Sequence, residues 1–290
     1  MTSTRFSLIQ DKEQRITSLQ NEKVKQVVKL RQRAYRDEQG LLIVEGMSEL
    51  QCALKNNRCP ISLFYCPDFF IGKNEAALVS QCRAAGAEAI ACAPAVFAKM
   101  AYRENPGGLL ALVPRVKCDL SGLKLTAAPL LVVAEAIEKP GNLGTILRSA
   151  DAAGADAVIV CDRCTDINNP NVVRASLGAI FTVPVAETSS EKAIQWLREK
   201  KIQILAASPH ARLAYTQADL RRGTAIVVGE EHGGLSALWM KAADLPVRIP
   251  MRGRIDSLNV AAATTILLFE AARQRHDPGA NSKHEIRNNI

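Results

Sequence analysis

From residue 130 onward, short apolar runs alternate with amphipathic segments along the chain. The apolar runs, which predict strands, cover residues 130–134, 157–160, 181–184, 202–206, 225–228 and 247–249. The amphipathic segments, which predict helices, cover residues 143–153, 171–177, 190–200 and 258–275. Strands that are apolar at nearly every position are typical of a parallel sheet buried on both faces. The pattern therefore predicts an α/β domain built from repeated strand and helix units, over residues 129–276.

Residues 1–115 form a second region with the same kind of alternation on a smaller scale. Helices are predicted over residues 23–35, 48–56 and 75–85, and strands over 41–44, 63–66 and 109–113. This order predicts a small α/β/α domain. Residues 116–128 have mixed charge and no sustained periodicity, so they are expected to be a linker. The polar residues 277–290 are expected to be disordered.

Three loops rich in glycine and asparagine follow predicted strands of the second domain. They begin at Pro140-Gly141-Asn142, at Gly229-Glu230-Glu231-His232-Gly233-Gly234, and at Ile249-Pro250-Met251, the last running on to Ser257-Leu258-Asn259. In open α/β sheets, ligands bind beyond the carboxyl ends of the strands. The loops are therefore expected to form one cleft, surrounded by polar side chains: Asn142, Arg148, Glu231, Ser257 and Asn259.

The three loops in this order resemble the SpoU/TrmH branch of the SPOUT RNA methyltransferases, over roughly residues 129–275. A weaker similarity covers two N-terminal segments, Gly40-Leu41-Leu42-Ile43-Val44-Glu45-Gly46 and Asn105-Pro106-Gly107-Gly108-Leu109-Leu110-Ala111. The resemblance implies methyl transfer from S-adenosylmethionine to a ribose 2′-hydroxyl of RNA. It also implies a SPOUT-type domain with a deep trefoil knot, a ribosomal-protein-like RNA-binding domain before it, and a homodimer that completes each site. The knot rests on the resemblance alone, since knots are essentially absent from proteins at large.

The resemblance assigns cofactor contacts to Gly229, Ile249 and Leu258, and places Arg148 closest to the reaction. Tight turns are the alternative explanation for the glycines, and a surface salt bridge is the alternative for Arg148. Arginine keeps its proton in proteins, so it is a poor general base. We therefore expect Arg148 to hold an RNA phosphate and to stabilise the alkoxide that develops during transfer.

The remaining polar loop residues have both a functional and a structural interpretation. Asn142 and Asn259 can orient a hydroxyl or a cofactor group, but asparagine also caps helices. Ser257 is either a substrate contact or the N-cap of the last helix. Glu231 would accept hydrogen bonds from arginine or ribose, or would be a solvated loop carboxylate. The second loop departs from the family pattern Asn-Glu-Gly, because it has Glu230-Glu231-His232, and this puts the role of Glu230 in question.

Several basic residues are candidates for RNA contact in a chain with a net charge of +8. Lys25, Lys29 and Arg33 lie in the stretch 23–36, which contains six lysines and arginines and no acidic residue. A solvated helix face is the alternative for them. Arg174 and Ser176 lie in a segment, 169–179, that resembles the family's RNA entrance, with helix packing as the alternative for Ser176.

Other function classes are disfavoured by missing motifs. The chain has no GxGxxG after a strand, no P-loop, and neither an apolar run of about 20 residues nor a secretory signal, so a cytoplasmic protein without membrane contact is expected. The eight cysteines and four histidines lack the spacing of a metal site, and Cys66 and Cys161 are interpreted as small buried hydrophobes. We expect a methyltransferase acting on ribosomal rather than transfer RNA. The alternatives are a noncatalytic RNA-binding ribosome-assembly factor and, more distantly, a nucleotide-dependent oxidoreductase.

Overall fold

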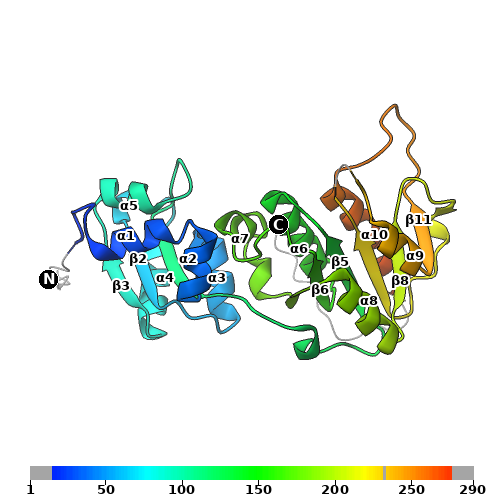
Figure 1. Ribbon diagram of the computed structural model, residues 1–290. Coiled ribbons are helices and arrows are strands. Elements are labelled where there is room, and N and C mark those ends of the chain that lie inside the picture. Colours follow the sequence, from blue (N-terminus) through cyan, green and yellow to red (C-terminus); the bar gives the residue numbers. More distant parts are fainter. Residues whose placement is uncertain (1–14, 231–232, 276–290) are drawn as a thin grey trace, which may run out of the picture. The chain divides into compact units, whose positions relative to one another are not determined.

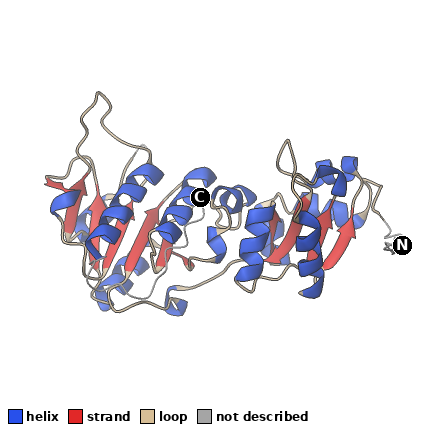
Figure 2. Ribbon diagram, turned by 180° about the vertical axis from the view of Figure 1, so that it is seen from behind, coloured by secondary structure: helices blue, strands red, loops and turns tan. Residues whose placement is uncertain are grey.

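The computed structural model describes residues 15–230 and 233–275, and it divides the chain into two compact units between Arg115 and Val116. Each unit is a sheet with helices packed against it (Figures 1 and 2). The expected tail, residues 277–290, lies outside the described residues.

The first unit contains a four-stranded mixed sheet in the order β1-β4-β2-β3. Its strands are β1 (Leu41–Glu45), β2 (Ser62–Tyr65), β3 (Glu88–Ala91) and β4 (Leu109–Pro114). Strand β4 is antiparallel to both β1 and β2, whereas β2 and β3 are parallel. The helices are α1 (Glu22–Lys29), α2 (Arg33–Gln39), α3 (Met47–Lys55), α4 (Glu75–Ala84) and α5 (Pro94–Met100), with a 3-10 turn η1 (Pro67–Phe69).

Both faces of this sheet are buried, which confirms the expected α/β/α layering. Ile43, Phe64 and Leu110 pack against apolar residues of α1 and α5. Their neighbours Leu42 and Leu63, which point to the other face because side chains alternate along a strand, are also fully buried. Strand β3 and helix α5 were not predicted from the sequence, since they are only four and seven residues long.

The helix expected over residues 23–35 is wrong, because the chain breaks between α1 and α2 at residues 30–32. Two arginines stabilise the break. The Arg31 guanidinium donates to the carbonyls of Lys99 and Ala101 at 2.9 Å each, at the end of α5. The buried Arg36 donates to the carbonyls of Leu30 and Arg31 at 2.8 Å each, which supplies the partners that those carbonyls would otherwise find within a helix.

The second unit contains a seven-stranded sheet in the order β7-β6-β5-β10-β8-β11-β9, and every pairing in it is parallel. Its strands are β5 (Leu130–Glu135), β6 (Ala157–Cys161), β7 (Val185–Thr188), β8 (Gln203–Ala207), β9 (Leu213–Ala214), β10 (Thr224–Val228) and β11 (Leu245–Arg248). The helices are α6 (Pro140–Ala152), α7 (Pro170–Ala175), α8 (Ser190–Glu199), α9 (Ala237–Ala242) and α10 (Val260–Arg275). The 3-10 turns are η2 (Leu120–Gly122), η3 (Ala179–Phe181) and η4 (Tyr215–Gln217). The parallel sheet confirms the predicted fold class.

Helices cover both faces of this sheet as well. Alternate strand residues such as Leu131, Ile159 and Val227 form a core with residues of α8 and α9. On the other face α10 contacts β10 and α6, and α6 contacts α7. The central strand β10 lies between β5 and β8, so the strand order reverses at this point and opens a ligand-binding position beyond the strand ends. The knot remains a prediction that rests on the family resemblance.

Strand β9 and helix α9 of the second unit were not predicted, and two segments that were predicted differ in the structure. Residues 181–184 are not a strand, because η3 occupies 179–181 and strand β7 begins only after Pro184. Residues 116–128 are not a free linker either, since Leu120 and Leu123 pack against the core and the Val116 backbone N–H donates to Asn168 Oδ1 at 2.8 Å.

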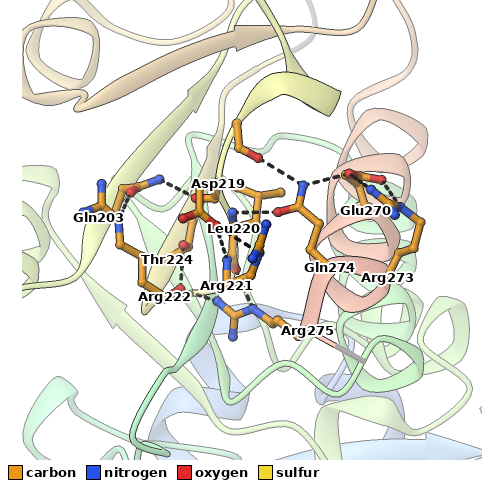
Figure 3. A network of polar contacts seen from close by, with 11 residues as sticks. Gln203, Asp219, Leu220, Arg221, Arg222, Thr224, Glu270, Arg273, Gln274 and Arg275 are labelled. Carbon is orange, nitrogen blue, oxygen red and sulfur yellow. Dashed lines mark hydrogen bonds and ion pairs between the residues drawn. The ribbon is translucent and has the colours of Figure 1, made fainter. Parts of the chain in front are cut away.

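The C-terminal end of α10 is fastened to the edge of the sheet where strands begin (Figure 3). The guanidinium of Arg275 donates to the carbonyls of Leu220, Ala128 and Arg222 at 2.7, 2.6 and 2.6 Å. Gln274 adds a bond from the Leu220 N–H to its Oε1 at 2.9 Å. These contacts supply hydrogen-bond donors to backbone carbonyls that lie outside the strands. They fix the position of α10, and the first residue of this helix, Val260, lines the candidate site.

Candidate active site

A cavity of about 490 Å³ lies at the carboxyl ends of the neighbouring strands β10, β8 and β11. It is lined from the second and third loops and from the loop after β8, by residues that include Ser208, His210, Val228, Gly229, Glu230, Ile249, Met251, Asp256, Ser257 and Leu258. The three residues expected to contact a cofactor, Gly229, Ile249 and Leu258, therefore lie around one cavity. Its volume falls within the range of small-molecule sites, about 300–1,000 Å³.

The second loop turns so tightly that side chains at its glycines would collide with it. A Cβ at Gly229 would lie 2.1 Å from the carbonyl oxygen of Gly234, and a Cβ at Gly233 would lie 2.1 Å from Glu230 Oε1. Glycine is thus required at position 229, where the close atoms belong to the backbone, whereas at position 233 the flexible Glu230 side chain could turn away. Glu230, where the sequence departs from the family pattern, lines the cavity. Glu231 and His232 lie outside the described residues.

The second loop is anchored from behind by two buried side chains. Glu135, at the end of β5, is 6% exposed, and its Oε2 accepts a hydrogen bond from the Ser236 backbone N–H at 2.9 Å. Trp239, on α9, is fully buried, and its indole Nε1 donates to Ser190 Oγ at 2.7 Å. These contacts fix the end of the loop and leave its glycine-rich part facing the cavity.

Asn142 and Asn259 meet although they are 117 residues apart in the sequence. Asn259 Nδ2 donates to Asn142 Oδ1 at 3.1 Å, and Asn259 Oδ1 accepts from the backbone N–H groups of Ala261 and Ala262 at 3.0 and 3.3 Å. Asn259 is therefore both the cap of α10 and a brace to α6. The brace joins the third loop to the first.

The capping roles considered for Ser257 and Asn142 are both wrong. Ser257 does not cap α10, because Asn259 does, and Ser257 is exposed at the cavity. Asn142 does not cap α6 either, since that helix begins at Pro140, with Lys139 at the N-cap, and Asn142 lies within its first turn. Proline at the first helical position explains the early start.

Arg148 is exposed on α6, six residues beyond Asn142. Among the described residues its side chain has no hydrogen bond and no ion pair, so the surface salt bridge considered as an alternative is not formed. It does not line the cavity. The expectation that all these residues surround one cleft is therefore corrected in part. Ser257 lines the cavity, and Asn142 and Asn259 lie next to it at the first turns of α6 and α10. Arg148 lies further along α6 and has no ion pair among the described residues.

The segment expected at the RNA entrance forms α7, and its two candidate residues differ. Arg174 is exposed, whereas Ser176 is 1% exposed and its hydroxyl donates to the Val173 carbonyl at 2.8 Å. Gly144 of α6 explains this burial, because a Cβ on it would lie 2.5 Å from Ala175 Cβ. The close approach of α6 and α7 encloses Ser176, so its hydroxyl is occupied by packing.

The three basic candidates of the first unit, Lys25, Lys29 and Arg33, differ in whether a carboxylate lies beside them. Lys25 pairs with Glu22 at 2.7 Å, and Arg33 lies 3.7 Å from Asp37. Lys29 is exposed and lies over the Tyr35 ring, with its Nζ 5.9 Å from the ring centroid. Within residues 15–230 and 233–275 no carboxylate forms an ion pair with Lys29, so its charge is the least neutralised of the three.

Residues 207–210 are the part of the cavity that the sequence analysis missed. This loop follows the carboxyl end of β8, which was the rule used for the other loops. It contains no glycine or asparagine, which were the residues that marked the other loops, so Ser208 and His210 were not predicted. Its position directly after the central strand β8 was the feature of the sequence that could have predicted it.

The cysteines interpreted as small hydrophobes are buried. Cys66 and Cys161 are both fully buried, and burial raises the pKa of each thiol. Burial also raises the pKa of Cys92 to about 12. The described residues contain no group of three or more His, Cys, Asp or Glu that would hold a metal ion. Across residues 15–230 and 233–275, none of the helices has the length and apolar character needed to cross a bilayer.

Comparison with known proteins places this fold and cavity in one class. Residues 129–269 match the SpoU rRNA methylase family, and residues 21–111 match the MRM3-like substrate binding domain. An uncharacterized tRNA/rRNA methyltransferase of Synechocystis is 32% identical over 266 residues, which are 90% of this chain and 94% of the relative. The 23S rRNA (guanosine(2553)-2′-O)-methyltransferase RlmP of Bacillus subtilis is 28% identical, over 88% of this chain and 97% of the relative.

Solved structures agree with these relatives. The AdoMet-bound rRNA methyltransferase from Sinorhizobium meliloti matches with a TM-score of 0.83 and 30% identity, over 91% of this chain and 99% of that one. The SpoU methyltransferase AviRb from Streptomyces viridochromogenes, in complex with AdoMet, matches with a TM-score of 0.80 and 30% identity, over 88% and 99% of the two chains. The chain belongs to the SpoU rRNA methylase family.

Proposed function

We propose that the protein transfers a methyl group from S-adenosylmethionine to a ribose 2′-hydroxyl of structured RNA, with ribosomal RNA preferred over transfer RNA. The observation that carries the proposal is the cavity of about 490 Å³ formed by the loops of a SpoU-family domain, with Arg148 exposed beyond it. Relatives named as 23S rRNA 2′-O-methyltransferases support the reaction and the substrate class, and the AdoMet-bound neighbours support the cofactor.

The cavity has the chemistry that S-adenosylmethionine requires. None of the described residues that line it is lysine or arginine, whereas Glu230 and Asp256 are carboxylates. Such a lining suits a ligand that has no phosphate and carries positive charge, and it disfavours a dinucleotide. Gly229, Ile249 and Leu258 would hold the cofactor, since all three line the cavity. When bound, the cofactor supplies an electrophilic methyl group on a sulfonium.

The chain's own residues orient the acceptor and stabilise its charge. Arg148 would hold the phosphate beside the target ribose and would stabilise the negative charge that develops on the 2′-oxygen. The proton passes to a phosphate oxygen or to water, because arginine does not release its own. Ser257, exposed at the cavity, orients the hydroxyl, and the hydrogen-bonded pair Asn142 and Asn259 keeps the third loop against α6. Glu231 is assigned to hydrogen bonding with arginine or ribose.

RNA is bound by both units. In the first unit we assign the main phosphate contact to Lys29. Lys25 and Arg33 are weaker candidates, because each already has a carboxylate within 4 Å. In the second unit Arg174 is exposed and contributes a further cation. Ser176 is left out, since its hydroxyl is buried.

We also infer a homodimer in which a second copy completes each site. Helix α10 exposes Phe269, which is 50% exposed, on the same face as Ala262 and Ile266. An apolar stripe of this kind is typical of a surface that another chain covers. Helix α6, which carries Arg148, packs beside α10 through a hydrogen bond of 2.7 Å between Ser149 Oγ and Thr265 Oγ1. A partner on this stripe would lie close to Arg148.

Binding and transfer assays on the purified full chain test the proposal. We expect calorimetry to detect S-adenosylmethionine binding, and we expect labelled methyl groups to enter ribosomal RNA that lacks this modification, at one ribose. Mapping ribose methylation in cells with and without the gene then identifies the nucleotide. RNA binding without any cofactor binding would instead support the noncatalytic assembly factor. A cytoplasmic location is proposed with this function, because bacterial relatives named as 23S rRNA methyltransferases act on RNA of that compartment.

A further inference from the structure

The loop between β11 and α10, residues 249–259, projects from the second unit (Figure 1, orange). Residues 250–258 make no hydrogen bond and no ion pair with any other described residue. Apart from Met251 and Leu258, every one of these residues is exposed. The loop is therefore held at its ends and by its contact with the cavity, and its tip is free to adapt to a ligand.

Three exposed arginines, Arg248, Arg252 and Arg254, lie on this loop or at its first end. None of them has a carboxylate partner among the described residues, although other arginines of the same unit do. Arg163, for example, pairs with Glu187 at 2.9 Å. The one acid of the loop, Asp256, lines the cavity. The loop thus presents concentrated positive charge that the protein itself does not neutralise.

The loop connects this charge to the candidate active site. Ile249, Met251, Asp256, Ser257 and Leu258 line the cavity, so the arginine-bearing tip begins directly beside it. The far end of the loop is Asn259, which is hydrogen-bonded to Asn142 on the helix that carries Arg148. A polyanion bound at the tip would therefore lie beside the cavity.

We propose that Arg252 and Arg254 bind phosphates of the substrate RNA on either side of the target nucleotide. The inference rests on the proposed function and adds a binding element to it. Guanidinium groups match phosphate oxygens through paired hydrogen bonds. Gly253 separates the two arginines, and no atom lies within 4 Å of the place where its Cβ would be, so RNA has open access. Ile255, 63% exposed, supplies an apolar contact for a sugar or base.

The salt dependence of RNA binding tests this assignment. The double variant Arg252→Gln and Arg254→Gln is compared with the wild-type chain, with a transcribed large-subunit ribosomal RNA fragment as the probe and potassium chloride varied. A matched control replaces two exposed cations that have no ion pair among the described residues and lie at the opposite end of the strands, just before β8: Lys200→Gln and Lys201→Gln. We expect the loop variant to lower the slope of log K against log salt by about 1.5–2, and to weaken binding roughly 10- to 50-fold near 0.1 M salt.

Charge-preserving variants and cofactor binding complete the experiment. Lysine at both positions should restore most of the slope, because it keeps the charge. Unchanged cofactor affinity in the glutamine variant verifies that the cavity is intact. An unchanged slope in that variant, or an equal loss in the control, overturns the assignment. If the wild-type chain transfers no methyl group to RNA, the proposed function fails, and the slopes still decide separately whether the loop binds RNA.

Discussion

Replacing Arg148 with alanine is expected to lower the rate of methyl transfer by about two orders of magnitude or more, the scale of losing one charge-stabilising donor. Its guanidinium is exposed and has no carboxylate partner among the described residues, so the full charge is available to the substrate. Because Arg148 does not line the cavity, the affinity for S-adenosylmethionine should change little. Single-turnover kinetics with saturating RNA, together with calorimetry of the cofactor, measure both quantities.

The matched variant is Arg148→Lys, which keeps the charge and loses the paired donors. We expect it to recover part of the rate, because a point charge still attracts phosphate but does not fix its orientation. A rate near that of wild type in Arg148→Ala would remove this residue from the catalytic step. Equal losses in rate and in cofactor affinity would show that the residue supports the fold of the site.

Replacing Gly229 with alanine is expected to weaken cofactor binding by about 10- to 100-fold, the range that corresponds to overpacking by roughly 1–3 kcal/mol. The added methyl group would lie 2.1 Å from the carbonyl oxygen of Gly234. Backbone atoms cannot rotate away as a side chain can, so the second loop has to open. Calorimetry of the cofactor measures the loss, and thermal unfolding determines whether the rest of the domain is affected.

Gly253→Ala is the control for this substitution. Gly253 lies in the third loop, has no positive φ, and has no atom within 4 Å of the position of a Cβ. Its replacement should leave cofactor affinity within about twofold. If both glycine variants weaken binding equally, flexibility rather than closure of the second loop explains the effect, and the geometric argument fails.

The central strands of the second unit, β5, β6, β8 and β10, could be predicted because their burial leaves a direct mark on the sequence, whereas β7 was misplaced and β9 was not predicted. Runs such as those of β5 and β10 are apolar at nearly every position, and each was found within one residue of its observed bounds. The rule that ligands bind beyond strand ends then located the cavity. Ile249 and Leu258, far apart from Gly229 in sequence, line the same cavity for this reason.

Features that depend on distant partners could not be predicted in this way. The break between α1 and α2 is stabilised by Arg31, which reaches carbonyls about 70 residues further along the chain. The burial of Ser176 depends on the close approach that Gly144 allows. The last helix was expected to begin at residue 258, which made Ser257 its candidate N-cap. The helix begins at Val260, and the side-chain oxygen that accepts from its free N–H groups is Oδ1 of Asn259.

The proposed function depends on which atom of the RNA accepts the methyl group. Base methylation usually needs an aromatic side chain to stack a flipped base or a cysteine to activate it. The described lining of the cavity contains no Phe, Trp, Tyr or Cys. It does contain Ser257, and Asn259, Asn142 and Arg148 follow beyond it, which suit a sugar hydroxyl beside a phosphate.

The most direct measurement therefore compares two substrate RNAs that differ by one oxygen atom. One carries ribose at the target nucleotide, and the other carries a single 2′-deoxyribose there. We predict that both bind with similar affinity, because one hydroxyl contributes little to a contact dominated by phosphates, and that only the ribose RNA accepts a methyl group. Methylation of the deoxy RNA at the same rate would show that the 2′-hydroxyl is not the acceptor and would contradict the proposed function.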